Sequence, residues 1–283
     1  GAGLRAQVPE LIWLLPAAGV AIVLLYRVCG MEQVKGTNQI LSAVRDAAPL
    51  KLRTAPLIFL ATILTHLSGG SAGREGAALQ LGGSISAFMG KKLRLDDKDE
   101  RILVMCGMAA AFSALFGTPL TAALFAMEVV SVGVMYYSAI VPCLVSSLAS
   151  ILLARLCGLH QEDCYPVELV PELGALELVQ VAAIGVLCAL LSILLCRVVH
   201  AAPKLYGRFL PNPLLRAAVG GALVLALTLL VGSQDYNGAG DAVIRRLLAG
   251  ETIPEAFVLK LLFTALTLGA GFLLLLEDAV GHL

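Results

Sequence analysis

Residues 68–77, with the sequence SGGSAGREGA, combine a glycine-rich turn with the beginning of an apolar run. Glycine permits an unwound and tightly turned backbone, and the apolar run 77–89 predicts a helix that starts directly after the turn. The first amides of a helix have no intrahelical partner, and the aligned peptide dipoles make that end partly positive. We therefore expect an anion site here. Glu75 supplies a built-in carboxylate, which would occupy the site when charged and leave it when protonated.

Two other interpretations of Arg74 and Glu75 are a solvated pair in a surface loop and an internal ion pair between two helices. They are the only charged residues between Ala55 and Gly90, and the apolar flanks argue against a surface loop. A charge at membrane depth costs about 2.5–3.5 kcal/mol on insertion scales, so such a charge is rarely retained without a function. We favour a functional role. The phosphate motif GxxxxGK[ST] is absent, which excludes a P-loop.

The composition identifies the setting of this segment. Hydrophobic residues make up 59% of the 283 residues and charged residues 14%, against about 25% charged in ordinary soluble domains. Lys and Arg (20) balance Asp and Glu (20), so the chain has no basic footprint for nucleic acid. High apolar content also excludes a disordered chain. We infer an integral membrane protein.

Continuous apolar runs separated by short polar loops cover almost the whole sequence. They are 11–26, 56–68, 77–89, 102–115, 119–134, 140–156, 178–196, 214–231 and 257–276. Several exceed the roughly 9–11 residues of a barrel strand, which favours helices. The runs 56–68 and 77–89 hold 13 residues each, fewer than the roughly 20 of a simple span. Short, glycine-interrupted segments are typical of broken helices that meet near the bilayer midplane.

The predicted fold is an all-α integral membrane protein with many short and broken transmembrane helices, in one transmembrane domain over residues 1–283. Residues 91–101 carry nine charges in eleven positions and are predicted to form a solvated loop.

The motif GGSAGREGAALQLGGSI at 69–85 resembles the GREG signature of the CLC family of chloride channels and transporters, with Glu75 in the place of the gating glutamate. Further matches follow the family order. KGTN at 35–38 resembles an earlier anion-coordinating turn, AFSALFGTPLTAALFAME at 111–128 a helix pair, and LLFTALTLGAGF at 261–272 the lead-in to a second anion-binding motif.

The resemblance implies a homodimer in which each subunit has its own anion pathway, built from two inverted halves. Residues 1–156 would form the first half and residues 157–283 a partial second half. Glu75 would gate the pathway and couple it to protons. The implied anion-binding residues are Gly36, Thr37, Asn38, Gly73, Arg74, Gly76, Gly271 and Phe272.

Departures from the family pattern leave the transported anion open. The chloride-type turn reads GSGIP, whereas residues 36–40 read GTNQI. The KGxN form and the HLSGGSAGREG context resemble the fluoride-exporting bacterial branch, which typically has methionine in the place of Thr37. A threonine hydroxyl could coordinate chloride as serine does. Many proton-coupled members carry a second glutamate where this sequence has Val129.

The end of the sequence departs most. After Phe272 the family continues with a glycine-rich turn, more helices and a pore tyrosine, whereas this sequence reads LLLLEDAVGHL. A path lined on one side leaves much of the cost of anion desolvation unmet. We therefore expect that these 283 residues alone do not conduct.

The predicted function is a CLC-type anion channel or anion/proton antiporter that moves chloride or fluoride and is gated by Glu75. It would use no cofactor or metal beyond the transported halide and protons. We expect a multi-pass homodimer in the lipid bilayer of a bacterial inner membrane, without a nucleic-acid partner. The alternatives are a transporter of another small solute and a non-conducting fragment. An intramembrane enzyme would require a nucleophile–base pair or HExxH within the spans.

Other polar residues carry weaker signals. His66 is expected to be structural rather than a proton shuttle, and Glu128 a packing carboxylate rather than a transport residue. His160, Asp163 and Cys164 match no metal-ligand pattern. Four cysteines are expected to be packed as small hydrophobes: Cys106, Cys143, Cys188 and Cys196.

Overall fold

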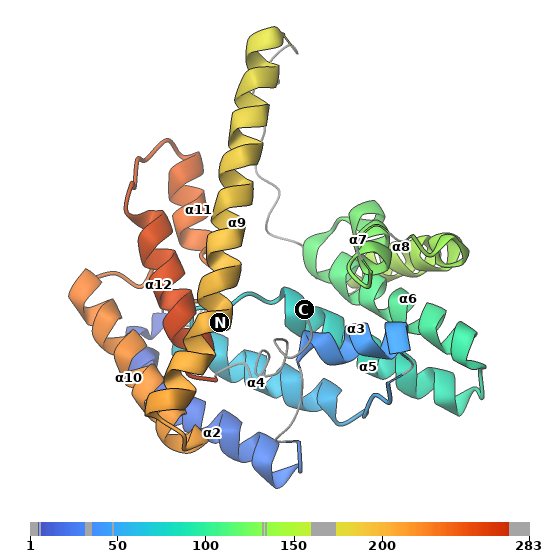
Figure 1. Cartoon of the computed structure of the whole chain (residues 1–283), viewed down its shortest axis with the longest axis horizontal. Coiled ribbons are helices and arrows are strands. Elements are labelled where there is room, and N and C mark those ends of the chain that lie inside the picture. The colour runs from blue at the N-terminus through green and yellow to red at the C-terminus, as the bar shows by residue number, and fades with distance from the viewer. Residues whose placement is uncertain are drawn as a thin grey trace.

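The computed structural model describes residues 5, 7–31, 36–46, 48–131, 133, 135–159 and 174–271. These residues form helices and connecting turns without a strand, which confirms the all-α prediction (Figure 1). The elements in chain order are η1 (Pro9–Leu14), α2 (Leu15–Val28), α3 (Thr37–Asp46), α4 (Thr54–Ser68), α5 (Glu75–Lys92), α6 (Asp97–Phe116), α7 (Pro119–Glu128), η2 (Tyr137–Ala139), α8 (Ile140–Leu156), α9 (Ala175–Phe209), α10 (Pro213–Val231), α11 (Asp241–Leu248) and α12 (Ala256–Gly269).

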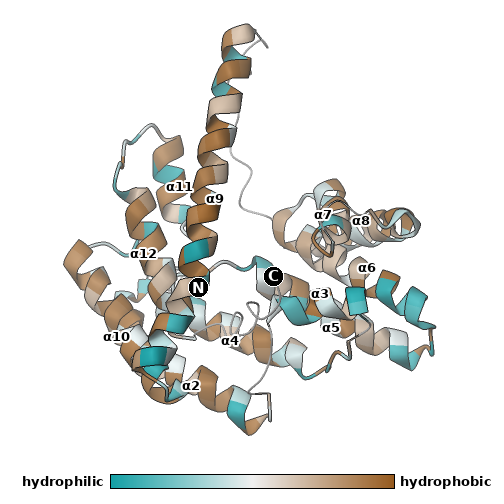
Figure 2. Cartoon of the chain, viewed as in Figure 1, coloured by the Kyte–Doolittle hydropathy of each residue, from teal (hydrophilic) through white to brown (hydrophobic). Residues whose placement is uncertain are grey.

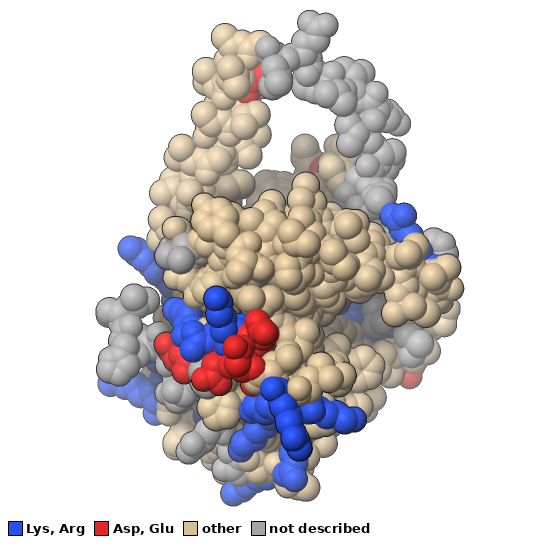
Figure 3. All heavy atoms as spheres, turned by 90° about the vertical axis from the view of Figure 1, so that its right-hand side faces the viewer, with Lys and Arg blue, Asp and Glu red and all other residues tan. Residues whose placement is uncertain are grey.

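The helices have the surface of a membrane protein. Four stretches in the described part are long and apolar enough to cross a bilayer: Pro9–Val28, Tyr137–Leu156, Ala175–Phe209 and Pro213–Val231. Most of the helical residues are hydrophobic (Figure 2). A broad face free of Lys, Arg, Asp and Glu lies above a group of charged side chains (Figure 3). Such an apolar outer surface is suited to lipid rather than to water.

Short helices also occur, as the sequence predicts. The apolar helices α4 and α12 contain 15 and 14 residues, which is below the roughly 20 residues of a simple span. Helix α5 extends to 18 residues because it begins at Glu75 and ends at Lys92. The break between α4 and α5 is the one predicted from the glycine-rich segment 68–77.

The buried side chains form two main cores. One joins α3 and α5–α8 around residues such as Ile40, Met105 and Met127, and the other joins α2, α4 and α10–α12 around Leu15 and Phe263. The second core therefore combines helices from both predicted halves of the chain. The two halves, 1–156 and 157–283, interlock rather than pack as separate bodies.

The segment 91–101 is solvent-exposed over most of its length, as predicted, but only residues 93–96 form a loop. Helix α5 continues to Lys92, and α6 starts at Asp97. Lysines at the end of one helix and acids at the start of the next oppose the helix dipoles favourably. The Asp96 side chain also accepts a hydrogen bond of 2.8 Å from the Asp99 amide. Charge alone predicted exposure correctly, but helix ends also tolerate charge.

Helix α9 projects from the rest of the described chain over part of its length (Figure 1). It has 35 residues, or about 52 Å at 1.5 Å per residue. Cys188 and Cys196 are exposed on it, so the expectation of packed thiols is wrong for these two. Cys106 and Cys143 are buried as expected, with their sulfur atoms 4.0 Å apart.

Candidate anion site at the α4–α5 break

The helix break is a buried stretch of irregular backbone. Helix α4 ends at Ser68, and Gly69 takes the left-handed conformation with φ 95° that favours glycine. Residues 69–72 are buried before α5 begins at Glu75. Polar backbone groups at membrane depth need partners within the protein. The groups that form hydrogen bonds with residues 69–72 therefore show what stabilises the break.

Carbonyl groups of the first two glycines are bonded by the turn that follows α10. The Asn237 side-chain amide donates to the Gly69 carbonyl at 2.7 Å, and the Gly238 N–H donates to the Gly70 carbonyl at 3.1 Å. The Thr228 hydroxyl lies within hydrogen-bonding distance of the Asn237 amide and holds it in place. This turn and the break are thus joined across more than half of the sequence.

Helix α12 supplies the remaining partners. The Ser71 N–H donates to the Thr267 hydroxyl at 3.0 Å, and the Ser71 hydroxyl lies 3.3 Å from that of Thr264. The ammonium group of Lys260 donates to the Ser71 hydroxyl at 2.8 Å. All of these hydrogen bonds from α12 reach Ser71, which lies four residues before Glu75.

The charged pair lies at the exposed edge of the break. Glu75 is the first residue of α5, and its side chain folds back over Gly73, where a Cβ atom would overlap the Glu75 carboxylate. The Arg74 guanidinium forms an ion pair with Asp241 at 3.8 Å. Arg74 thus pairs with Asp241 rather than with the neighbouring Glu75.

The earlier turn meets the break from the other core. Gly36 has φ 55°, and α3 begins at Thr37. A Cβ atom on Gly76 would lie 2.8 Å from the Thr37 hydroxyl oxygen, so the first residue of α3 touches the first turn of α5. The structure therefore places Thr37 of the predicted 36–38 turn against Gly76 of the predicted 73–76 segment.

The predicted second motif is only partly described. Gly271 has φ 78° and follows the end of α12, one turn after Thr267. A Cβ atom built on it would meet no atom of the described residues within 4 Å. Phe272 lies outside the described residues, as do Lys35 and the loop containing His160, Asp163 and Cys164.

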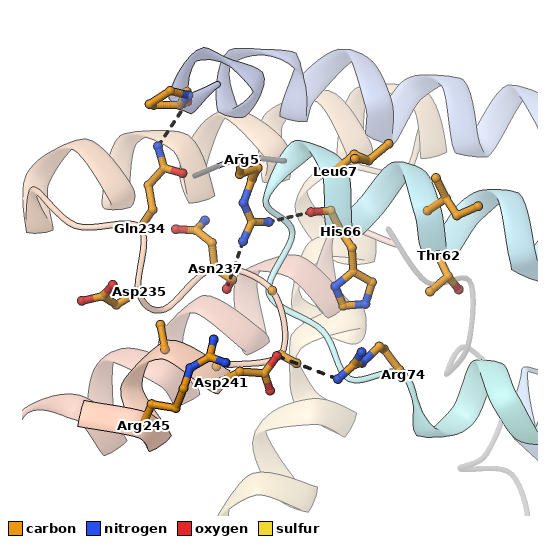
Figure 4. A pocket seen from close by; sticks show the side chains of 16 residues that line it. Arg5, Thr62, His66, Leu67, Arg74, Gln234, Asp235, Asn237, Asp241 and Arg245 are labelled. Atoms are coloured by element: carbon orange, nitrogen blue, oxygen red, sulfur yellow. Dashed lines mark hydrogen bonds and ion pairs between the residues drawn. The ribbon is translucent and has the colours of Figure 1, made fainter. Parts of the chain in front are cut away.

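A pocket of about 710 Å³, lined in part by charged side chains, opens beside the break (Figure 4). The charged residues around it come from the N-terminal segment, the α4–α5 break and the α10–α11 turn. They are Arg5, Arg74, Asp235, Asp241 and Arg245. Arg5 donates to the His66 carbonyl at 2.6 Å, close to the end of α4. Cations exceed anions here, which favours approach of an anion.

Several residues of the site were missed from the sequence. Lys260 is the only charge within the apolar run 257–276, so the criterion that selected Arg74 and Glu75 would also have found it. Asn237 and Asp241 gave no such signal, because they lie in a polar turn. Among the weaker candidates, Glu128 is exposed at the end of α7 and the His66 ring lines the pocket.

The structure combines apolar helices, a buried helix break and two helix N-termini in contact. These features are typical of membrane proteins that place irregular backbone at a polar site. The chain belongs to the CLC family, because the family description of the voltage-gated chloride channel matches residues 17–273.

Individual relatives agree with this assignment. The chain is 32% identical over 275 residues to a chloride/fluoride channel protein of Pseudomonas syringae pv. tomato, covering 95% of the chain and 61% of that protein. It is 26% identical to a putative ClcB-like chloride channel protein of Ralstonia nicotianae, covering 95% and 65%. The chain thus spans less than two thirds of these two relatives.

Solved structures give the same fold. A CLC-type fluoride/proton antiporter superposes with a TM-score of 0.88 at 31% identity, covering 96% of this chain and 69% of the other. A slow cyanobacterial Cl⁻/H⁺ antiporter superposes with a TM-score of 0.79 at 18% identity, covering 95% and 66%. The second comparison supports the fold alone.

Proposed function

We propose that this chain forms one wall of the anion pathway of a CLC-type transporter or channel, with Glu75 as its gate. The observation that carries the proposal is the contact of the α3 and α5 N-termini at Thr37 and Gly76. Glu75 begins α5 beside this contact. Two partly positive helix ends and one carboxylate that can vacate them form a switchable anion site.

The proposed mechanism is a competition between the Glu75 carboxylate and the anion. An anion that leaves water must regain donors for its lost hydration. The first N–H groups of α5 and the hydroxyl of Thr37 are the donors available here. When the Glu75 carboxylate binds a proton, it loses its attraction for the helix end and the anion takes its place. Release of that proton on the other side returns the carboxylate and couples the two movements.

The anion is proposed to be a halide, with fluoride as the first candidate. Two relatives more than 30% identical carry fluoride in their names, as a chloride/fluoride channel protein and a fluoride/proton antiporter. Chloride is the second candidate, because Thr37 supplies a hydroxyl donor of the kind that serine gives to chloride. Proton-coupled exchange is favoured over a passive channel by the carboxylate gate.

Two copies in a bacterial inner membrane are proposed as the working assembly. The named relatives are bacterial. One face of α8 presents an exposed apolar stripe at helical spacing, suited to lipid or to a second copy. Its residues are Val141, Val145, Leu148, Leu152 and Leu156. No cofactor, resident metal or nucleic acid is proposed to take part, and the activity is transport rather than catalysis.

The test is a flux assay in liposomes on the protein at the full length of its relatives, because these 283 residues alone are expected not to conduct. Efflux of fluoride and of chloride is followed with ion-selective electrodes, and proton movement with a pH electrode in the same vessel. Halide efflux with opposed proton movement supports the antiporter, and halide efflux without it supports a channel. Protein-free liposomes serve as the control. Efflux of neither halide would contradict the proposed function.

A further inference from the structure

Two thiols face one another between α6 and α8. The Sγ atoms of Cys106 and Cys143 lie 4.0 Å apart, close enough for one S–H to donate to the other sulfur. Both side chains are buried, Cys106 with 7% of its surface exposed and Cys143 with 0%. The proposed anion site lies at the N-termini of α3 and α5 and uses neither of them. We call these two residues the thiol pair.

Serine side chains hold α6 and α8 in close contact around the thiol pair. The Ser146 hydroxyl donates to the Cys106 carbonyl at 3.0 Å, and the Ser150 hydroxyl donates to the Ala110 carbonyl at 2.7 Å. A third bond, of 2.8 Å, runs in the other direction from a serine of α6 to a carbonyl of α8. A serine side chain is short, so it reaches the backbone of a neighbouring helix only where the two helices approach closely. Small residues permit this approach in membrane proteins.

The close approach of α6 and α8 suits a disulfide. A disulfide needs Cα atoms about 4.4–6.8 Å apart and sulfur atoms about 2.05 Å apart. The sulfur atoms of the thiol pair start at 4.0 Å, so they must close a gap of about 2 Å. Rotation about the Cα–Cβ bonds moves a sulfur atom over such a distance without breaking either helix.

We propose that the thiol pair is a modification site, which hydrogen peroxide oxidises to a disulfide between α6 and α8. Cys106, the more exposed of the two, reacts first. Its thiolate attacks one oxygen of the peroxide, so that an S–O bond forms, the O–O bond breaks and hydroxide leaves. The Cys143 thiol then attacks the sulfenic sulfur, so that the S–S bond forms, the S–O bond breaks and water leaves. The two thiols lose two electrons and two protons in total, and one peroxide becomes two molecules of water.

The disulfide would restrain three helices rather than two. Gly107 follows Cys106 and packs against α5, because a Cβ atom on Gly107 would overlap the Gly82 carbonyl. Helix α5 begins at Glu75. Fixing α6 to α8 therefore also restrains the helix that carries the proposed gate. The bond would close a loop across 37 positions of the sequence, which restricts the unfolded chain and stabilises the folded one.

The experiment counts thiols before and after treatment with hydrogen peroxide. Serine replaces the five other cysteines, so that only the thiol pair remains: Cys29, Cys157, Cys164, Cys188 and Cys196. Thiols are titrated in denaturant, and the size of the chain is checked by electrophoresis without reducing agent. The count should fall from two to zero while the chain stays monomeric in the gel, and dithiothreitol should restore the count to two.

The melting temperature gives a second readout. Oxidation should raise it by roughly 5–10 °C, as expected for a disulfide that closes a long loop. Cys143→Ser in the same background keeps one thiol and should show no rise. In wild type, mass spectrometry of the oxidised protein should find a peptide containing residue 106 linked to one containing residue 143. This measurement serves where the five-serine protein does not fold.

A matched control keeps Cys188 and Cys196 and replaces the thiol pair with alanine. These two thiols are exposed on α9, and eight helical positions separate them by about 12 Å, which is too far for a disulfide. Peroxide should oxidise them without forming a disulfide within one chain. Two thiols that persist in the protein carrying only Cys106 and Cys143 would overturn the proposal, as would a disulfide between chains in place of one within the chain.

Discussion

At the scale of the residue, Thr37 is the most informative side chain of the earlier turn. Its hydroxyl faces Gly76 at the point where α3 and α5 touch. It places a side-chain donor at that contact. The identity of residue 37 should therefore influence which halide is preferred.

The substitution Thr37→Met should change the ratio of chloride to fluoride flux. It removes one hydroxyl donor, and a hydrogen bond of this kind contributes about 0.5–1.5 kcal/mol to binding. Its loss should change the flux ratio roughly 2- to 10-fold. Chloride flux should fall relative to fluoride flux in paired electrode recordings. Thr37→Ser keeps the hydroxyl and is the matched control. An unchanged ratio would place Thr37 outside the pathway.

At the scale of the element, glycines set how closely α5 approaches α6. A Cβ atom on Gly82 would lie within van der Waals overlap of the Gly107 carbonyl group. The obstacle is backbone, so neither helix can yield by changing a rotamer. This contact fixes α5, and with it the position of Glu75 at its start.

Gly82→Ala should therefore lower stability by about 1–3 kcal/mol, the usual cost of overpacking. The measurement is the melting temperature in detergent. Gly185→Ala is the control, because a Cβ atom there meets nothing within 4 Å on helix α9. Equal melting temperatures for both variants would show that the α5–α6 contact is looser than described.

The α4–α5 break was predictable from the sequence, because glycines and an isolated charged pair both mark it. The length of α9 was not: its apolar run covers 178–196, while the helix continues to Phe209 through Arg197 and Lys204. Polar residues at a helix end do not stop a helix by themselves. The partners of the break were also hidden, because Asn237 is 168 residues from Gly69 and no local pattern links them.

At the scale of the whole molecule, the two predicted halves hold one another at the break. The first half supplies the break itself, and the second half supplies Asn237, Gly238 and α12 to satisfy it. Irregular backbone is therefore stable at this depth only when both halves are present. The boundary at residues 156–157 therefore divides the sequence, but one hydrophobic core contains residues from both sides of it.

Asn237→Ala should test this dependence. It leaves the buried Gly69 carbonyl without its 2.7 Å donor, at a cost of about 1–3 kcal/mol. The melting temperature should fall. Gln234→Ala removes an exposed amide whose contact with the Pro9 carbonyl is 3.2 Å, and should have little effect. If both variants melt together with wild type, the break is held by other contacts.

The most direct test of the central claim records halide flux and proton flux together in one vessel. Wild type, Glu75→Ala and Glu75→Gln are each reconstituted in a separate liposome preparation. Neither replacement can carry a proton between the anion site and solution. The account predicts coupled movement in wild type and loss of proton movement in both variants, with halide flux either retained without pH dependence or abolished. Glu75→Ala that still exchanges halide for protons at the wild-type ratio would contradict the assignment of Glu75 as the gate.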